Sequence, residues 1–258
     1  MKIATFNVNG VRGRLPRLLE WLAEAQPDVA CLQEIKTGDA TFPHEPLEAE
    51  GYRVLWHGMP RHHGVAVLSR GPAPIEVRRG LPGDSTDGQA RYLEAQVGGL
   101  RVASVYLPNG NPVGSDNFDY KLRWFRRFND HARSLLATGE DVIFCGDFNV
   151  VPTNQDIYNA GSWRFDAVLQ PETRALWNEL LGQGWIDSAR HLHPGERQRL
   201  YTFWVNRFAY LQNAGFRMDF LLVGPSLANA LHACEVDAPH RGRDKPSDHA
   251  PVWIELAR

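Results

Sequence analysis

Cysteine, long apolar runs and net charge are all scarce in this sequence. Its 258 residues include only three cysteines, far apart and set in apolar segments, namely Cys31, Cys145 and Cys234. An odd number of separated cysteines predicts buried free thiols rather than disulfides or a zinc site. No apolar run approaches the roughly 20 residues that cross a membrane, and the first residues lack the apolar core of a signal peptide. We therefore expect a folded cytoplasmic protein with no membrane contact.

The chain has almost no net charge, with 28 Lys and Arg against 30 Asp and Glu. Proteins that bind nucleic acids are often strongly basic, so a phosphate-binding face must here be local if there is one. Basic residues gather in four places, at 12–17, 61–63, 123–127 and 241–245. Solvated surface explains these clusters as well as a phosphate-binding face does, and the sequence leaves both interpretations open.

Glycine-rich nucleotide-binding motifs are absent as well. Neither a phosphate loop nor a dinucleotide fingerprint is present, which argues against chemistry on a nucleotide cofactor. No repeat, low-complexity tract or linker-sized run divides the chain. The length suits one large domain, so we expect a single domain over residues 1–258.

Apolar patterning indicates the secondary structure. Short runs rich in β-branched residues predict strands at 3–6, 29–32, 65–68, 102–107, 142–144, 220–223 and 252–256. Helical spacing of apolar residues predicts helices around 15–22, 122–136 and 172–181, the last ended by glycines at 182 and 184. Strands interleaved with helices predict an α/β layered fold, in which helices cover buried sheets. The pattern does not tell the number of sheets.

Polar side chains punctuate these apolar runs at six points along the chain. They are Asn7, Glu34, Tyr106 with Asn109, Asp147 with Asn149, Asp219, and Asp248 with His249. Each one alone could be a turn residue, a helix cap or a solvated charge. Together they predict an active site at one edge of the sheets, where loops carry function and strands hold it rigid.

The types of these residues indicate the chemistry. A cluster of Asp, Glu and Asn with one His suits Mg²⁺ or Mn²⁺ and suits zinc poorly, and magnesium in turn suggests a phosphate substrate. Ser247, Asp248 and His249 cannot form a catalytic triad, because consecutive strand residues point to opposite faces. Asp219 is the better partner for His249.

Five segments in order resemble exonuclease III and related abasic-site endonucleases, namely residues 6–10, 32–36, 106–110, 146–149 and 245–251. The segment Tyr106–Gly110 is similar to the motif of the exonuclease III branch. Deoxyribonuclease I, inositol-phosphate phosphatases and sphingomyelinases carry a different motif at this place. The resemblance implies a four-layer α/β sandwich, with two stacked mixed β-sheets flanked by helices and the site at one edge. It also implies a monomeric nuclease that uses Mg²⁺, with Mn²⁺ as the alternative. Its substrate would be double-stranded DNA, cut 5′ to abasic sites and cleared of nucleotides or blocking groups at 3′ ends.

The same resemblance implies a role for each polar residue. Glu34 holds the metal with Asn7 beside it, and Asp248 belongs to the metal side. Asp147 activates or orients the attacking water. The full implied metal set is Asn7, Glu34, Asp147, Asn149, Asp248 and His249. Clustered carboxylates repel one another without a metal, so replacing Glu34 or Asp147 is expected to leave stability unchanged or raised.

The remaining implied roles concern the phosphate and the transition state. Asn149 contacts the phosphoryl oxygens, and Tyr106 contacts the phosphate or assists the leaving group. His249, oriented by Asp219, stabilises the developing negative charge. The implied catalytic set is Tyr106, Asp147, Asn149, Asp219 and His249.

Substrate contacts are implied at Asn109, Phe203, Trp204, Phe216 and Arg217. The three aromatics would line a pocket for an extruded abasic deoxyribose, although a core position explains them too, Trp204 above all. The chain departs from the family pattern at Val205–Asn206, Phe216 and His62–His63, which puts its substrate preference in doubt. Another phosphoesterase of the same superfamily, or a non-catalytic nucleic-acid-binding relative, stays open as an alternative.

Overall fold

Two six-stranded β-sheets form the centre of the computed structural model, which describes residues 1–257. Sheet A has the strand order β11 (Leu231–Val236), β12 (Val252–Leu256), β1 (Lys2–Asn7), β2 (Val29–Gln33), β4 (Val65–Ser69) and β3 (Arg53–His57). Sheet B has the order β5 (Ile75–Arg79), β6 (Tyr92–Val97), β7 (Leu100–Tyr106), β8 (Val142–Asp147), β10 (Asp219–Val223) and β9 (Ile186–Asp187).

Each sheet is mixed, with one parallel pair at its centre. In sheet A β1 runs parallel to β2, and in sheet B β7 runs parallel to β8. Parallel neighbours end at the same edge of a sheet. Asn7 therefore lies opposite Gln33, and Tyr106 lies opposite Asp147. This register gathers the polar strand ends that the sequence singles out.

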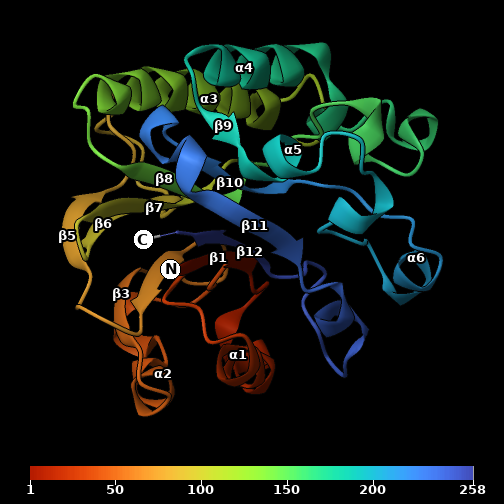
Figure 1. Cartoon of the computed structure of the whole chain (residues 1–258). Coiled ribbons are helices and arrows are strands. Elements are labelled where there is room, and N and C mark those ends of the chain that lie inside the picture. The colour runs from red at the N-terminus through yellow and green to blue at the C-terminus, as the bar shows by residue number, and fades with distance from the viewer. Residues whose placement is uncertain (258) are drawn as a thin grey trace.

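The two sheets stack face to face and carry helices on their outer faces, as Figure 1 shows. α1 (Val11–Ala25) and α2 (His44–Ala49) lie on the sheet A side, and α3 (Asp116–Leu136) and α4 (Pro171–Gly182) lie on the sheet B side. Two short helices, α5 (Ser188–Leu192) and α6 (Arg207–Leu211), follow α4. The expected four-layer α/β sandwich, with two mixed β-sheets flanked by helices, is confirmed.

Apolar periodicity explains how the outer helices attach. On α3, Leu122, Phe125, Phe128, Ala132 and Leu135 are buried at helical spacing and face sheet B. The Phe128 ring meets the Phe144 ring of β8 edge to face, with 4.8 Å between centroids. Each buried Leu or Phe side chain of this set contributes about 1.5–3 kcal/mol relative to exposure, so α3 is firmly fixed behind the site.

All seven predicted strands are present, but five further strands and three short helices were not predicted. β5 is exposed at every position, and β6 contains the buried Glu94, so neither shows an apolar run. The first helix begins at Val11, earlier than predicted, and Pro16 lies inside it. The three cysteines are free and buried, as expected. Among residues 1–257, no helix combines the length and apolarity that a membrane crossing needs.

Candidate active site

The amide of Asn7 joins the two sheets at the edge where their parallel strands end. Its Nδ2 donates to Glu34 Oε1 at 3.0 Å, beside sheet A, and to Asp147 Oδ2 at 2.9 Å, on sheet B. Asn7 is fully buried and its Oδ1 accepts from the backbone N–H of Asn9. The two carboxylates are thus held close together by one nitrogen atom.

His249 extends the site on the sheet B side. Its Nδ1 lies 2.7 Å from Asp219 Oδ2, and its Nε2 lies 3.8 Å from Asp147 Oδ2. Thr202 Oγ1 donates to the same Asp219 oxygen at 2.7 Å and fixes that carboxylate. Asp219 is therefore the partner of His249, as strand geometry predicts.

Asp248 joins the site through Asn9. Its Oδ1 accepts from Asn9 Nδ2 at 2.9 Å, while Lys36 Nζ donates to Asn9 Oδ1 at 2.6 Å and pairs with Glu34 Oε2 at 2.6 Å. Tyr106 donates its hydroxyl to Glu34 Oε1 at 2.8 Å. One hydrogen-bonded network therefore runs from Asp248 through Glu34 and Asn7 to Asp147, and His249 and Asp219 adjoin its far end.

Burial and these contacts set the protonation of the site. Burial raises the pKa of Asp147 to about 7, with the Asp219 charge adding to the effect and His249 opposing it. Burial works against the charged form of His249, but the Asp219 carboxylate outweighs burial and raises the pKa to about 10. Burial also disfavours the Glu34 charge, yet hydrogen bonds from Asn7 and Lys36 outweigh it and lower the pKa to about 2. At neutral pH, Glu34 and His249 are charged while Asp147 is close to its midpoint.

The raised pKa of Asp147 predicts a pH-dependent stability. Because the folded pKa of about 7 exceeds the ordinary 3.8, the unfolded chain loses this proton first, and the free energy of unfolding falls as pH rises from about 4 to about 7. Asp147→Asn removes this ionisation. We expect the free energy of unfolding of the variant, relative to wild type, to grow between about pH 4 and pH 7 by up to about 1.4 kcal/mol per pH unit and to stay constant above that. Urea denaturation in EDTA measures it, and a difference that does not vary with pH would contradict the assignment.

The donor set fits a hard divalent cation. Four carboxylates gather here, those of Glu34, Asp147, Asp219 and Asp248, and the cations Lys36 and His249 pair directly with Glu34 and Asp219. Asp147, Asp219 and His249 bring ligand atoms within 4.8 Å of one another, and Asp219 Oδ1 is buried without a partner in the described chain. A protonated His249, however, donates from both nitrogens and offers no lone pair. The better fit is therefore beside Glu34, where the oxygens are less enclosed.

Aromatic side chains lie beside His249. The Phe203 ring is 4.9 Å from the His249 ring and 5.5 Å from the Phe216 ring, measured between centroids. Trp163, which the sequence did not indicate, meets Phe216 edge to face at 4.7 Å. Phe203 is half-buried and Phe216 is almost fully buried. Phe203 is thus the aromatic best placed to meet a substrate.

Two expected substrate contacts have structural roles instead. Trp204 is buried among Tyr201 and Ala250, and its indole N–H donates to Asn213 Oδ1. Arg217 is buried, and its guanidinium pairs with Asp156 at 2.7 Å and Asp187 at 2.8 Å. Both side chains are almost fully buried, which argues against direct contact with substrate, and their predicted substrate contacts stay predictions.

A cavity of about 500 Å³ lies near Tyr106, whose ring is 6.1 Å from the ring of the lining residue His63. Asn109 lines it together with His62, His63 and Arg91. Asn109 Nδ2 donates to Asn149 Oδ1 at 3.3 Å, and Asn149 Nδ2 donates to Leu107 O at 2.8 Å. Asn109 is therefore accessible beside the site. Asn149 serves in part to hold the loop after β8 to the loop after β7.

Several supporting residues could not be found from the sequence. Lys121 of α3 is fully buried and donates to Asn109 O at 3.0 Å and to Asn149 O at 2.5 Å. Thr202 fixes Asp219, and Gln33 hydrogen-bonds Ser104 across the two sheets at 3.0 Å. Their only signal is a polar side chain within an otherwise apolar segment.

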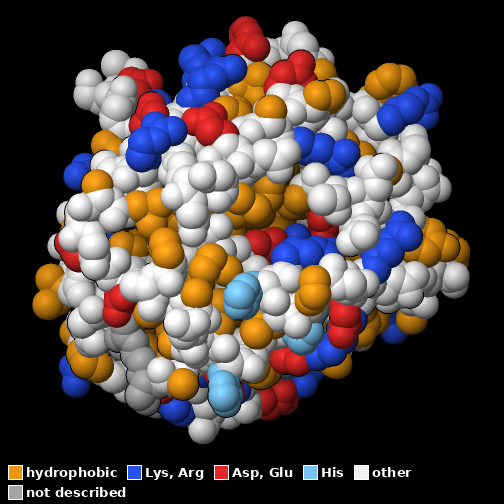
Figure 2. Space-filling view, turned by 45° about the horizontal axis from the view of Figure 1, so that its top comes forward, with side chains coloured by type: hydrophobic (Ala, Val, Ile, Leu, Met, Phe, Trp, Pro, Cys, Tyr) orange, Lys and Arg blue, Asp and Glu red, His pale blue; other side chains and the backbone are white. Residues whose placement is uncertain are grey.

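The basic clusters do not form one continuous positively charged surface. Figure 2 shows Lys and Arg interspersed with Asp and Glu on the face in view. Arg127 pairs with Asp87 at 2.8 Å, Arg243 pairs with Glu24 at 2.7 Å, and buried Arg241 donates to Trp204 O. Much of the arginine in these clusters is thus engaged within the protein.

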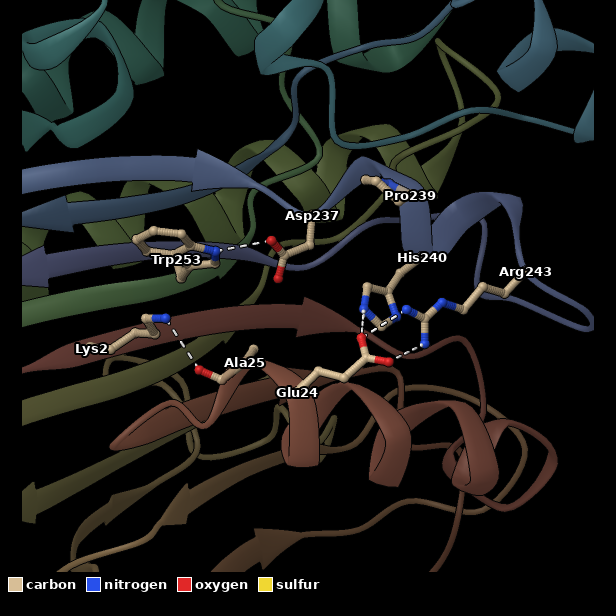
Figure 3. A pocket seen from close by; sticks show the side chains of 8 residues that line it. All are labelled: Lys2, Glu24, Ala25, Asp237, Pro239, His240, Arg243 and Trp253. Carbon is tan, nitrogen blue, oxygen red and sulfur yellow. Dashed lines mark hydrogen bonds and ion pairs between the residues drawn. The ribbon is translucent and has the colours of Figure 1, made fainter.

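A second cavity, of about 300 Å³, lies between α1 and the segment that precedes β12 (Figure 3). Glu24 there pairs with His240 and Arg243, and both oxygens of Asp237 accept indole N–H groups, from Trp21 and Trp253. These groups satisfy one another across the cavity. These contacts hold α1 against the segment that precedes β12. Glu24 and Asp237 are therefore engaged in structural contacts and are not free for catalysis.

Comparisons with known proteins agree with this geometry. Exodeoxyribonuclease III of Haemophilus influenzae is 34% identical over 267 aligned residues, which cover 99% of this chain and 100% of that protein. A 3′-5′ exonuclease (NExo) from Neisseria meningitidis superposes with a TM-score of 0.95 at 36% identity, and an AP endonuclease from Archaeoglobus fulgidus with 0.94 at 32%, both covering 100% of either chain. The model of the endonuclease/exonuclease/phosphatase family matches residues 4–249. The chain belongs to that family, in its branch of exonuclease III and AP endonucleases.

Proposed function

We propose that this protein is a metal-dependent DNA-repair nuclease that hydrolyses phosphodiesters 5′ to abasic sites and clears nucleotides or blocking groups from 3′ ends of duplex DNA. Relatives named exodeoxyribonuclease III and AP endonuclease support the nuclease activity. A structure of 3′ phosphatase NExo from Neisseria, 36% identical to this chain, is bound to a product DNA hairpin and supports DNA as the substrate. Action as a cytoplasmic monomer stays a prediction.

The proposal rests on Asp147, a carboxylate that titrates near neutral pH, and on His249, which lies beside it and carries a positive charge. Asp147 has a pKa of about 7, which suits a general base that takes a proton from water at neutral pH. Charged His249 lies 3.8 Å from it and is held in place by Asp219. It can donate a hydrogen bond to a phosphoryl oxygen as negative charge grows there.

The reaction follows from these positions. Water attacks phosphorus as Asp147 accepts its proton, and the bond to the 3′ oxygen of the neighbouring nucleotide breaks on the opposite side. The Tyr106 hydroxyl, next to Glu34, is placed to meet the phosphate or the leaving oxygen. A divalent cation held by Glu34, with Asn7 and Asp147 beside it, would neutralise phosphate charge, Mg²⁺ being the first choice and Mn²⁺ the second.

We assign the selection of abasic sites to Phe203 and the aromatic side chains next to it. An abasic nucleotide loses little pairing or stacking when it leaves the helix, whereas an intact nucleotide costs a few kcal/mol. A sugar without a base can pack against Phe203 beside His249, and a base would meet the neighbouring Phe216 and Trp163.

Phe203→Ala is expected to relax discrimination, with incision of undamaged duplex rising relative to incision at an abasic site. Matched duplexes that differ by one base measure this ratio. The release of 3′ nucleotides by the same variant serves as the internal control. If both activities fell equally and the melting temperature fell with them, Phe203 would be a structural residue.

Two alternatives remain distinguishable. A phosphoesterase for small molecules would bind with little salt dependence, whereas duplex DNA affinity falls steeply with salt because bound phosphates release counterions. A non-catalytic relative is disfavoured because Glu34, Asp147, Asp219 and His249 are all present and brought together. One assay with abasic, 3′-resected and 3′-phosphate duplexes would test the proposal, and no cleavage of any of them would contradict it.

A further inference from the structure

Lys36 lies where a cation would bind the active-site glutamate. Its ammonium Nζ is 2.6 Å from Glu34 Oε2 and 2.6 Å from Asn9 Oδ1. Glu34 and Lys36 both have positive φ angles, 50° and 51°, which are uncommon for residues other than glycine. The backbone N–H of Lys36 donates to His63 O at 2.9 Å, so this loop is anchored to the next one.

The two oxygens of Glu34 differ in what surrounds them. Oε1 accepts two hydrogen bonds, from Asn7 Nδ2 at 3.0 Å and from the Tyr106 hydroxyl at 2.8 Å. Oε2 has Lys36 as its partner within residues 1–257. A carboxylate oxygen with two hydrogen bonds has little capacity left for a metal ion. Oε2 is therefore the atom of Glu34 that a divalent cation would take, and Lys36 already occupies it.

Lys36 is able to leave this position. Its side chain is 32% exposed, and a lysine stem has four rotatable methylene groups that reach solvent easily. Lys121 offers a contrast, because its ammonium is buried between two backbone carbonyls. An ammonium and a divalent cation on one carboxylate oxygen would repel each other by several kcal/mol at about 4 Å, so the two exclude one another.

We propose that Lys36 holds Glu34 in the metal-free protein as a built-in cation, and that a divalent metal ion binds by displacing its ammonium from Glu34 Oε2. This inference rests on the proposed function, which places the metal at Glu34. Displacement breaks the contact of Lys36 with Glu34 and leaves its bond to Asn9, whose amide is in turn bonded to Asp248. Lys36 thereby lowers the affinity for metal while it keeps the empty site folded.

The test is Mn²⁺ binding to the full chain without DNA, followed by the electron paramagnetic resonance signal of free Mn²⁺. Lys36→Met is expected to bind Mn²⁺ at least about fivefold more tightly than wild type, because no ammonium competes for Glu34. Arg12→Met is the matched control. It removes one exposed positive charge from the start of α1, where Val11 N donates to Ile35 O of the same loop, and within residues 1–257 it forms no ion pair with Glu34. We expect a change of less than about twofold because an exposed charge is screened.

The outcomes separate this inference from the proposed function. Unchanged or weaker binding by Lys36→Met, or equal tightening in Arg12→Met, would overturn the displacement. Glu34→Gln should lose tight Mn²⁺ binding whether or not Lys36 competes with the metal. That loss would place the metal site at Glu34. Wild-type protein that binds no Mn²⁺ and still cleaves DNA in EDTA would overturn the metal-dependent function itself. Melting curves of every variant show whether each one is folded.

Discussion

Asp147→Asn is expected to lower turnover on abasic DNA by about 10³-fold or more, since a positioned general base contributes about 10²–10⁴-fold. The asparagine amide cannot take the proton of the attacking water, and it places an N–H where Asp147 accepts from Asn7. The effect should be on turnover rather than on DNA binding.

Single-turnover kinetics and DNA affinity, measured on the same preparation, check this result. Wild-type activity should also decline as pH falls below about 7, because Asp147 becomes protonated there, and the residual activity of Asp147→Asn should lack that decline. A variant that kept turnover within about tenfold of wild type would remove Asp147 from the role of base.

Glu34→Gln is expected to lower turnover by about 10²–10³-fold, as expected when a charged ligand of the reacting site is lost. Unlike Asp147→Asn, it should also lower stability. The carboxylate of Glu34 is paired with Lys36 at 2.6 Å and accepts from Asn7 and Tyr106. Charge-assisted hydrogen bonds of this kind contribute about 1.5–3 kcal/mol each when shielded, and we expect a loss near the lower figure because Lys36 is partly exposed.

Thermal melting in EDTA distinguishes the two variants. The sequence-based expectation is that repulsion among carboxylates destabilises both positions. The low pKa of Glu34 argues against it there, because neighbouring donors favour the charge of this carboxylate. It still applies to Asp147, whose pKa is raised. A melting temperature of Glu34→Gln above that of wild type would contradict this separation.

The fold and the site differ in how far sequence could predict them. The seven apolar strands and the polar residues at their ends were visible as patterns, because two-sided burial gives continuous apolar runs. β5 was invisible because an exposed edge strand needs no apolar face. That the chain is a single domain stays a prediction.

Within the site, residue types were predictable but orientations were not. Asp219 was identifiable as the partner of His249 because strand geometry excludes Asp248. The burial of Arg217 was not, since its partners Asp156 and Asp187 lie 61 and 30 positions away in sequence. Lys36 belongs to segment 32–36, which resembles the family, but its contact with Glu34 depends on two left-handed backbone positions that sequence does not reveal.

We infer that this site hydrolyses duplex DNA with the help of a divalent cation. The most direct measurement is the cleavage of a duplex with one abasic site by purified protein, first in EDTA and then with Mg²⁺ added in excess. We predict no incision in EDTA and incision on the 5′ side of the abasic site once Mg²⁺ is present. Equal incision in both conditions, or none in either with folded protein, would contradict the account.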